Sequence, residues 1–298
     1  MKLIAGSSNL PLAQKIAEKL NLPLVETDSS EFANGERRVW IKEQLAGEDV
    51  VIIQSFSAPV DEHIMEFLLL ADATERLGAR SIHAVIPWLG YSLQDKVFVP
   101  GEPIAAKVIA NLVSTAHIDR VYLLDLHNSS TPGFFSIPSA HLSAMQLFIA
   151  DIQTRFAGKE LVVASPDFGG LKRARQFASS LGTDLVNIDK TRDLCTGEVT
   201  AVGLQGEVRG KVALLFDDVI VSGSTVVETS ELLKQQGATE THFFATHGPL
   251  VESAIEKLSA SSIDNIIVTN SIQHQRLPQN CTEIDISPVL ISALQEWL

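Results

Sequence analysis

Apolar runs and helical patterns alternate along the whole chain. The strand-like runs are rich in Val, Ile, Leu and Ala, whereas the segments between them repeat apolar residues at the three- and four-residue spacing of a helix. The runs predict strands at 2–5, 24–27, 50–54, 83–87, 121–125, 160–165, 185–189, 212–217, 241–245 and 266–269. The intervening periodicity predicts helices at 10–20, 60–77, 103–116, 143–156, 170–181 and 224–236.

This alternation predicts βαβ units with right-handed crossovers, and therefore mostly parallel sheets flanked by helices. The two halves contain similar sets of elements, so we expect two related α/β domains at 1–144 and 145–298. Ser287 and Pro288 mark the start of a closing helix, with Ser as N-cap and Pro in the first turn. The pattern leaves open which domain that helix packs against.

The composition and net charge exclude several classes of function. A chain of 298 residues suits two domains of about 150 residues each. The net charge of −13 argues against a nucleic-acid or anionic-membrane surface, although it allows a phosphorylated substrate. No run is long enough to span a membrane, and the short first strand lacks the features of a signal peptide. The two cysteines, Cys195 and Cys281, lack metal-ligand spacing. Such a low number favours a reducing compartment over the alternative of one isolated disulfide, so we expect a cytoplasmic protein.

The run from 213 to 225 carries the most specific chemistry. An apolar strand ends in Asp217 and Asp218, and a short loop of hydroxyls and glycine then opens a helix. Backbone N–H groups and the dipole at a helix N-terminus favour phosphate, and neighbouring carboxylates accept hydrogen bonds from vicinal sugar hydroxyls. The run therefore fits a ribose-phosphate site. Taken alone, it fits an ordinary helix N-cap equally well.

Three further polar clusters follow predicted strands. Asp125 and His127 follow the strand at 121–125, and Asp167 precedes a glycine pair that opens a basic helix. These residues fit a divalent cation beside a phosphate, but a structural histidine and turn glycines would look the same. Lys190 and Arg192 lie in a polar stretch that follows the strand predicted at 185–189. That stretch is either a solvated surface loop or a mobile arm that reaches a transferring phosphoryl group.

Taken in order, these segments resemble one family across essentially the whole chain. The run at 217–225 resembles the ribose-phosphate motif of the type I phosphoribosyltransferase fold. The full set resembles the ribose-phosphate diphosphokinases, also called phosphoribosyl pyrophosphate synthetases. The matching segments are the nucleotide hairpin at 31–36, the proline–tyrosine–glutamine–aspartate signature at 86–96, the metal strand at 125–127 with 133–135, the pyrophosphate loop at 165–175 and the catalytic arm at 190–192.

The resemblance implies a reaction and a role for each matching residue. ATP and ribose 5-phosphate would give AMP and 5-phosphoribosyl 1-diphosphate, with two Rossmann-like domains and Mg²⁺ as cofactor. The implied roles are metal binding for His127 and Asp167, with Asp125 as an outer-shell partner; pyrophosphate binding for Asp167, Gly169 and Gly170; catalysis for Lys190 and Arg192; ribose 5-phosphate binding for Asp217, Asp218, Ser222, Gly223, Ser224 and Thr225; and ATP binding for Phe32, Asn34, Glu36, Gln94 and Asp95.

The resemblance also implies an assembly. Hairpin residues would reach the adenine from a neighbouring subunit, so the active form would be a homo-oligomer, and the family assembles as hexamers built from dimers.

The sequence departs from the family pattern at four places. Leu93 stands where the family carries an adenine-stacking Arg, Ser222 stands at a usual Thr and keeps its hydroxyl, and Ser224 stands at a usual Gly. The segment 97–103 lacks the basic residues of the allosterically regulated class. Two other functions therefore remain alternatives. A phosphoribosyltransferase would explain 217–225 but not the first domain, and a non-catalytic regulatory paralogue would explain Leu93 but not the retained His127, Asp167, Lys190 and Arg192.

Overall fold

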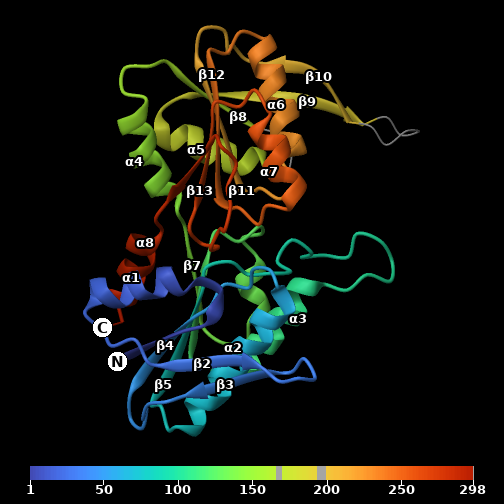
Figure 1. Ribbon diagram of the computed structural model, residues 1–298. Coiled ribbons are helices and arrows are strands. Elements are labelled where there is room, and N and C mark those ends of the chain that lie inside the picture. Colours follow the sequence, from blue (N-terminus) through green and yellow to red (C-terminus); the bar gives the residue numbers. More distant parts are fainter. Residues whose placement is uncertain (166–169, 193–198, 298) are drawn as a thin grey trace. The chain divides into compact units, whose positions relative to one another are not determined.

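The computed structural model describes residues 1–165, 170–192 and 199–297. The chain forms two compact units. The first consists of residues 1–144, 270–273 and 285–298, and the second of residues 145–269 and 274–284. Each unit is an α/β layer structure with helices on both faces of a sheet (Figure 1).

The first unit is built on a five-stranded parallel sheet. Its order is β1 (Lys2–Ala5), β4 (Asp49–Ile53), β5 (Ser81–Ile86), β6 (Arg120–Leu124) and β7 (Ser139–Leu142). A separate antiparallel hairpin joins β2 (Thr27–Glu31) to β3 (Arg37–Ile41). The helices are α1 (Leu10–Leu20), α2 (Val60–Arg76), α3 (Ala105–Thr115) and α8 (Ser287–Gln295), with single turns η1 (Ser7–Asn9) and η2 (Thr131–Phe134).

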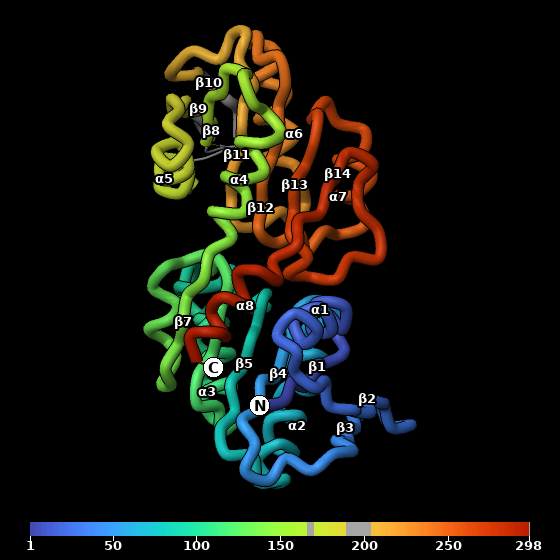
Figure 2. Tube along the Cα trace, turned by 90° about the vertical axis from the view of Figure 1, so that its left-hand side faces the viewer, coloured from blue at the N-terminus to red at the C-terminus, as the bar shows by residue number. Residues whose placement is uncertain are grey.

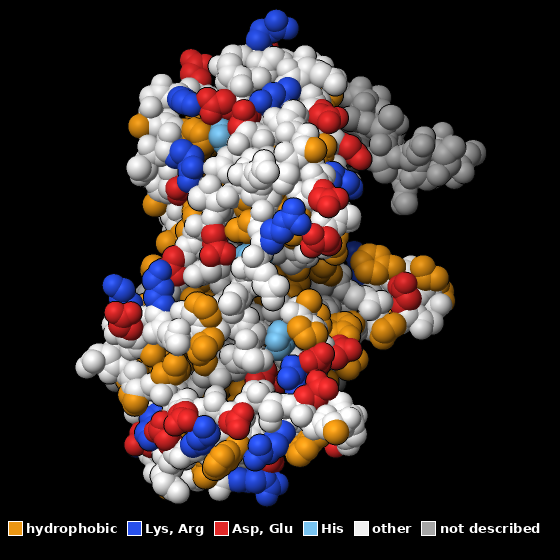
Figure 3. All heavy atoms as spheres, in the orientation of Figure 1, with side chains coloured by type: hydrophobic (Ala, Val, Ile, Leu, Met, Phe, Trp, Pro, Cys, Tyr) orange, Lys and Arg blue, Asp and Glu red, His pale blue; other side chains and the backbone are white. Residues whose placement is uncertain are grey.

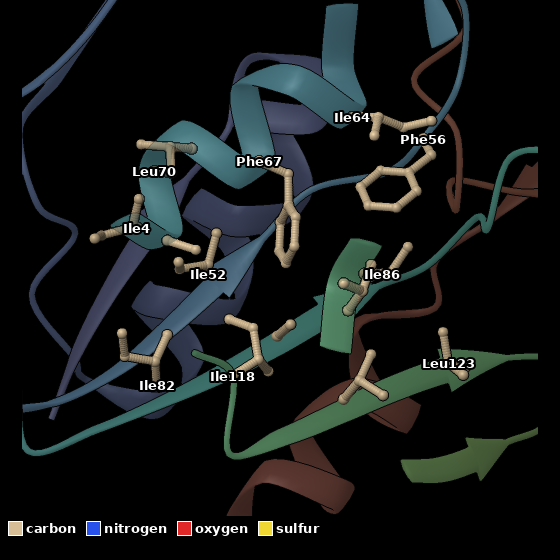
Figure 4. Close-up of a cluster of buried hydrophobic side chains, with 14 of the residues drawn as sticks. Ile4, Ile52, Phe56, Ile64, Phe67, Leu70, Ile82, Ile86, Ile118 and Leu123 are labelled. Atoms are coloured by element: carbon tan, nitrogen blue, oxygen red, sulfur yellow. The ribbon is translucent and has the colours of Figure 1, made fainter. Parts of the chain in front are cut away.

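The core of the first unit lies between this sheet and helices α2 and α3. Ile64, Phe67 and Leu70 of α2 point toward strand residues such as Ile52 (Figure 4). Because Phe67 is fully buried, its removal from water contributes roughly 1.5–3 kcal/mol to folding. This packing makes the sheet a rigid support for the polar residues that follow its strands.

The second unit is built on a seven-stranded sheet. Its order is β10 (Val199–Gln205), β9 (Asp184–Arg192), β8 (Leu161–Ser165), β11 (Val212–Val219), β12 (Glu240–His247), β13 (Asn265–Thr269) and β14 (Cys281–Ile284). Only the β9–β10 pair in this sheet is antiparallel among the described residues. The helices are α4 (Met145–Arg155), α5 (Leu171–Leu181), α6 (Ser224–Gln235) and α7 (Glu252–Ser259).

The two faces of the second sheet have different cores. Aliphatic side chains of α6 and α7 cover one face. On the other face, Phe148 of α4 and Phe177 of α5 pack against Phe216 and Phe244, with the rings of Phe177 and Phe216 stacked at 4.4 Å between centroids. Helix α5 is therefore held firmly beside β11, the strand that carries Asp217 and Asp218.

The two units repeat one topology. Strands β4, β5, β6 and β7 follow β1 in the first sheet, and β11, β12, β13 and β14 follow β8 in the second. On the other side of β1, Leu24 forms a parallel bridge with Leu3 and leads into the β2–β3 hairpin. On the other side of β8, β9 leads into its hairpin with β10. The predicted α/β class with mostly parallel sheets is confirmed.

The structure groups two late segments with the first unit. Residues 270–273 and 285–298 lie there, whereas the sequence division kept 145–298 together apart from the open question of the closing helix. Helix α8 lies beside α1 and β7 (Figure 2). The Asn9 side chain donates to the Asn270 carbonyl at 2.8 Å, and Ser55 Oγ donates to the Ser271 carbonyl at 2.5 Å. These long-range hydrogen bonds have no local sequence signal.

Several elements differ from expectation: the strand predicted at 24–27 begins only at Thr27, as β2, and β3, β7, β10, β14 and α7 were not predicted. Strand β9 continues to Arg192, so the backbone of Lys190 and Arg192 belongs to a strand paired with β10 and not to a loop. Ser287 is the first residue of α8 and not its N-cap, and its Oγ donates to the Asp285 carboxylate at 2.7 Å. Within the described residues, no helix is long and apolar enough to cross a membrane.

Candidate active site

The carboxyl end of β11 and the loop after it form the most complete polar constellation of the second unit. Strand β11 lies between β8 and β12, and Asp217 and Asp218 are near its end. Asp218 is only 2% exposed. Parallel sheets place ligand sites beyond this end of their strands, so the pair lies where the sequence predicted ribose recognition.

The loop into α6 has the geometry of an anion site. Gly223 has φ = +70°, which an alanine would adopt only with strain, and it lies directly before α6. The Ser222 and Thr225 side chains are exposed, and Ser224 Oγ accepts a hydrogen bond from Lys257 Nζ of α7 at 2.7 Å. Hydroxyls, a helix N-terminus and a cation therefore gather at one place, which favours phosphate.

Arg173 joins the carboxylates to α5. Its Nη2 lies 2.7 Å from Asp217 Oδ1 and 2.5 Å from Asp218 Oδ1. Asp217 Oδ1 also accepts the backbone N–H of Asp218 at 2.9 Å. Arg173 lies inside the predicted pyrophosphate segment at 165–175, but the sequence pattern indicates no role for it. Its only signal was the basic start of the helix at 171–175.

The electrostatics of this pair are unusual. Burial, and then the neighbouring Asp218 carboxylate, raise the pKa of Asp217 to about 7, while Arg173 acts in the opposite direction. Asp217 therefore takes up a proton at a higher pH than an isolated aspartate does. Because the protons of such a pair are shared, this titration belongs to the pair as a whole.

In the first unit, the predicted metal segment follows β6. Asp125 has φ = +33°, and its Oδ2 accepts the Ala144 backbone N–H at 2.8 Å. The Leu126 N–H donates to His141 Nε2 at 2.9 Å. These two hydrogen bonds fix Asp125 and Leu126 at the start of the turn. The next residue, His127, is exposed, whereas Leu126 is buried.

The structure brings two of the predicted segments together. Asn128 Nδ2 donates to Asp95 Oδ2 at 2.5 Å, which links the signature at 86–96 to the segment at 125–128. Gln94 is held through its backbone, since its carbonyl accepts the Ala106 N–H at 3.1 Å. The sequence pattern indicates no role for Asn128. Its signal was only its position next to His127.

The tip of the β2–β3 hairpin exposes an aromatic side chain. Phe32 is 50% exposed, and its backbone N–H donates to the Glu36 carbonyl at 2.8 Å. Asn34 Oδ1 accepts the Glu36 N–H at 3.2 Å, and Gly35 has φ = +88°. Phe32, Asn34 and Glu36 are therefore held together on one turn, with an apolar ring facing water.

The segment between β5 and α3 contains the departure at Leu93, which is 37% exposed. Further along, Val97, Phe98 and Val99 are at least 49% exposed, and hydrophobic side chains cover this protruding segment in Figure 3. The Lys96 ammonium lies 5.0 Å from the ring centroid of Phe98. The Lys96 side chain therefore lies against the Phe98 ring in this structure.

Some predicted site residues are not among the residues that the structure describes. Asp167 and Gly169 lie outside the described residues, and only the backbone of Lys190 and Arg192 is described, paired with Ala201 and Val199. Gly170 is buried directly before α5, and its carbonyl accepts the Ala174 N–H at 2.9 Å. The glycine pair therefore leads into the helix that carries Arg173.

The donor chemistry near β6 suits Mg²⁺. No group of three or more His, Cys, Asp or Glu side chains that could form a full metal cage occurs within the described ranges. Mg²⁺ does not require one, because it keeps several waters and usually binds one or two protein groups together with substrate phosphates. An exposed His127 beside the Asp95–Asn128 pair fits such an open site.

Comparisons with known proteins identify the family of this chain. Residues 1–116 match the family described as the N-terminal domain of ribose phosphate pyrophosphokinase, and residues 187–296 match the phosphoribosyl synthetase-associated domain. A ribose-phosphate pyrophosphokinase from Granulibacter bethesdensis is 41% identical, with 99% of this chain and 96% of the relative covered. One from Thermotoga maritima is 40% identical, with 99% and 94% covered.

A solved structure is similar over the same length. The crystal structure of phosphoribosylpyrophosphate synthetase from Mycobacterium smegmatis superposes with a TM-score of 0.92 at 34% identity, covering 99% of this chain and 98% of the other.

Proposed function

The chain belongs to the ribose-phosphate pyrophosphokinase family, and from this premise we propose how its own residues carry out the reaction. The enzyme transfers the pyrophosphoryl group of ATP to the C1 hydroxyl of ribose 5-phosphate. The products are AMP and 5-phosphoribosyl 1-diphosphate. The observation that carries the assignment of residues is the carboxylate pair of partly buried Asp217 and buried Asp218, followed by the loop into α6 at the end of β11.

Ribose 5-phosphate binds at this strand end. Asp217 and Asp218 accept hydrogen bonds from the vicinal ribose hydroxyls, because carboxylates are strong acceptors for such a diol. Ser222, Gly223, Ser224 and Thr225 receive the 5-phosphate through their hydroxyls and backbone N–H groups. Lys257, bonded to Ser224, adds a positive charge at the same helix N-terminus.

The transfer is an in-line displacement and needs no covalent enzyme intermediate. The C1 hydroxyl oxygen forms a bond to the β-phosphorus while the bond from that phosphorus to the α–β bridging oxygen breaks, and the hydroxyl proton is lost to solvent. Lys190 and Arg192 stabilise the negative charge on the transferring group. The backbone of both residues lies in the part of β9 that pairs with β10.

His127 and Asp167 would hold Mg²⁺ together with the ATP phosphates, and Asp125 supports the turn that carries His127. When bound, Mg²⁺ neutralises phosphate charge and fixes the orientation of the nucleotide. Asp167, Gly169 and Gly170 form the pyrophosphate loop. The glycines suit this loop because they allow the backbone to approach a phosphate closely.

The adenine site uses the hairpin tip and the signature segment. Phe32, Asn34 and Glu36 contact the base, and Gln94 and Asp95 complete the pocket. The exposed Phe32 ring supports a site completed by a neighbouring subunit, because a large aromatic side chain at a turn tip gains most when a partner covers it. The active form is therefore a homo-oligomer built from dimers, with hexamers as the expected assembly. Its location is the cytoplasm, which the cysteine-poor composition supports.

One assay separates this function from the alternatives. Purified protein is mixed with ATP, Mg²⁺ and ribose 5-phosphate, and AMP and 5-phosphoribosyl 1-diphosphate are measured. Both products should form in equal amounts. A phosphoribosyltransferase would instead consume 5-phosphoribosyl 1-diphosphate with a nucleobase, and a regulatory paralogue would form neither product.

A further inference from the structure

A single guanidinium nitrogen bridges the two carboxylates of the ribose site. Arg173 comes from α5, whereas Asp217 and Asp218 come from β11, so the bridge fixes the helix to the strand end as well as the carboxylates to each other. The side chain of Asp218 is 2% exposed and that of Arg173 is 25% exposed. A carboxylate this deeply buried needs a compensating partner, and Arg173 supplies it.

We propose that Arg173 is a positioning residue for ribose 5-phosphate: its guanidinium clamps Asp217 and Asp218 side by side in the ionised form that accepts the ribose diol. This inference rests on the proposed function, because it takes the carboxylate pair to be the ribose site. Arg173 acts in this role through the two carboxylates, which its guanidinium contacts directly.

The clamp has two physical consequences. Two carboxylates on successive residues repel each other, so without a shared cation they would separate or take up a proton. A protonated carboxyl also loses acceptor capacity, and a diol needs acceptors. Arg173 opposes both effects, since one nitrogen attracts both Oδ1 atoms and thereby stabilises the doubly ionised pair.

The charged surroundings make the effect depend on pH. Within the described residues, Asp218 on β11 raises the pKa of Asp217, and Arg173 on α5 lowers it. His247 lies further along β12, opposite Val219, and Lys257 of α7 binds Ser224 in the following loop. Removing the guanidinium therefore raises the pKa of Asp217 from its already elevated value, so the variant should need a higher pH to bind ribose.

The test is Arg173→Gln, measured from pH 7 to pH 9 with Mg²⁺ present. At pH 7 we expect the KM for ribose 5-phosphate to rise about 10- to 100-fold, the range for losing a charge-assisted hydrogen bond, while the KM for ATP stays within about threefold. The ratio of variant to wild-type KM should fall as the pH rises. Arg173→Lys keeps the charge and should show a weaker loss and a smaller pH effect.

The matched control is Arg155→Gln in the same unit. Arg155 forms an ion pair with Asp151 on α4, so this variant also removes an arginine–carboxylate contact but should leave both KM values unchanged. A ribose 5-phosphate KM for Arg173→Gln equal to that of the wild type would overturn the proposal. An increase that is the same at every pH, and that Lys does not relieve, would assign Arg173 a purely structural role and would overturn it too.

Calorimetric binding of ribose 5-phosphate gives the same comparison without turnover. If the wild type bound ribose 5-phosphate but formed no AMP, the proposed function would fail while the binding data still decided the role of Arg173. If turnover were normal and the variants bound ribose 5-phosphate as the wild type does, only the clamp would be rejected.

Discussion

Replacing Gly223 by Ala should damage the phosphate loop in two separable ways. Gly223 has φ = +70°, and a Cβ built there would lie 2.8 Å from Leu258 Cδ2 and 2.9 Å from its Cγ. Leu258 is fully buried in the core between α7 and the sheet. The new methyl group would therefore meet both an unfavourable backbone conformation and a side chain with no space to retreat.

The two costs can be estimated independently. A non-glycine residue in the left-handed region costs roughly 1–2 kcal/mol. Forcing extra volume into a packed core costs about 1–3 kcal/mol. The free energy of unfolding of Gly223→Ala should thus fall by about 2–5 kcal/mol, and the loop should shift away from its phosphate-binding geometry.

Gly182→Ala is the matched control for the backbone term. Gly182 follows α5 in the same unit with φ = +69°, and no atom lies within 4 Å of its built Cβ. Urea unfolding and the KM for ribose 5-phosphate should be measured for both variants. Gly182→Ala should lose only about 1–2 kcal/mol and keep its KM, whereas Gly223→Ala should lose more stability and raise the KM. Equal losses in the two variants would refute the overlap with Leu258, and an unchanged KM for Gly223→Ala would refute the role of the loop.

Three further outcomes are expected. Lys190→Ala and Arg192→Ala should each lower kcat by about 100-fold or more with a smaller change in KM, because the positive charges act on the transferring group. A rise in KM alone would mean that the two residues bind substrate and do not stabilise the transition state. His127→Ala combined with Asp167→Ala should abolish turnover while the circular dichroism spectrum and thermal midpoint stay near wild type, and wild-type turnover would reject the metal site. Leu93→Arg should tighten ATP binding by roughly 0.5–2 kcal/mol in calorimetry if it restores stacking on adenine, and unchanged affinity would mean that the base is held elsewhere.

Local patterns in the sequence predicted most of the architecture. The alternation of apolar runs with helical periodicity depends only on neighbouring residues, and it located most strands and helices to within a few positions. The run from Asp217 to Thr225 is also local, because one strand end, one turn and one helix start supply all of its parts. Such features are readable because the residues that cooperate are adjacent in the chain.

Contacts between segments that are far apart in the chain could not be predicted from the sequence. The limit of β9 is set by its pairing with β10, so the polar residues at 190–192 looked like a loop although cross-strand hydrogen bonds hold them in a strand. The closing helix lies with the first unit because of its contacts with α1 and β7, and its own amphipathic pattern carries no record of that choice.

The same distinction between local patterns and long-range contacts holds at the candidate active site. Sequence alone determined which strand ends carry acidic residues and which loop suits a phosphate, since strand, turn and helix propensities act over a few residues. Only the tertiary structure placed Arg173 against Asp217, 44 residues away, and Asn128 against Asp95, 33 residues away. A charge on a helix gives no indication of its partner until packing of the helix on the sheet sets the distance, because ion pairs and hydrogen bonds act only at short range.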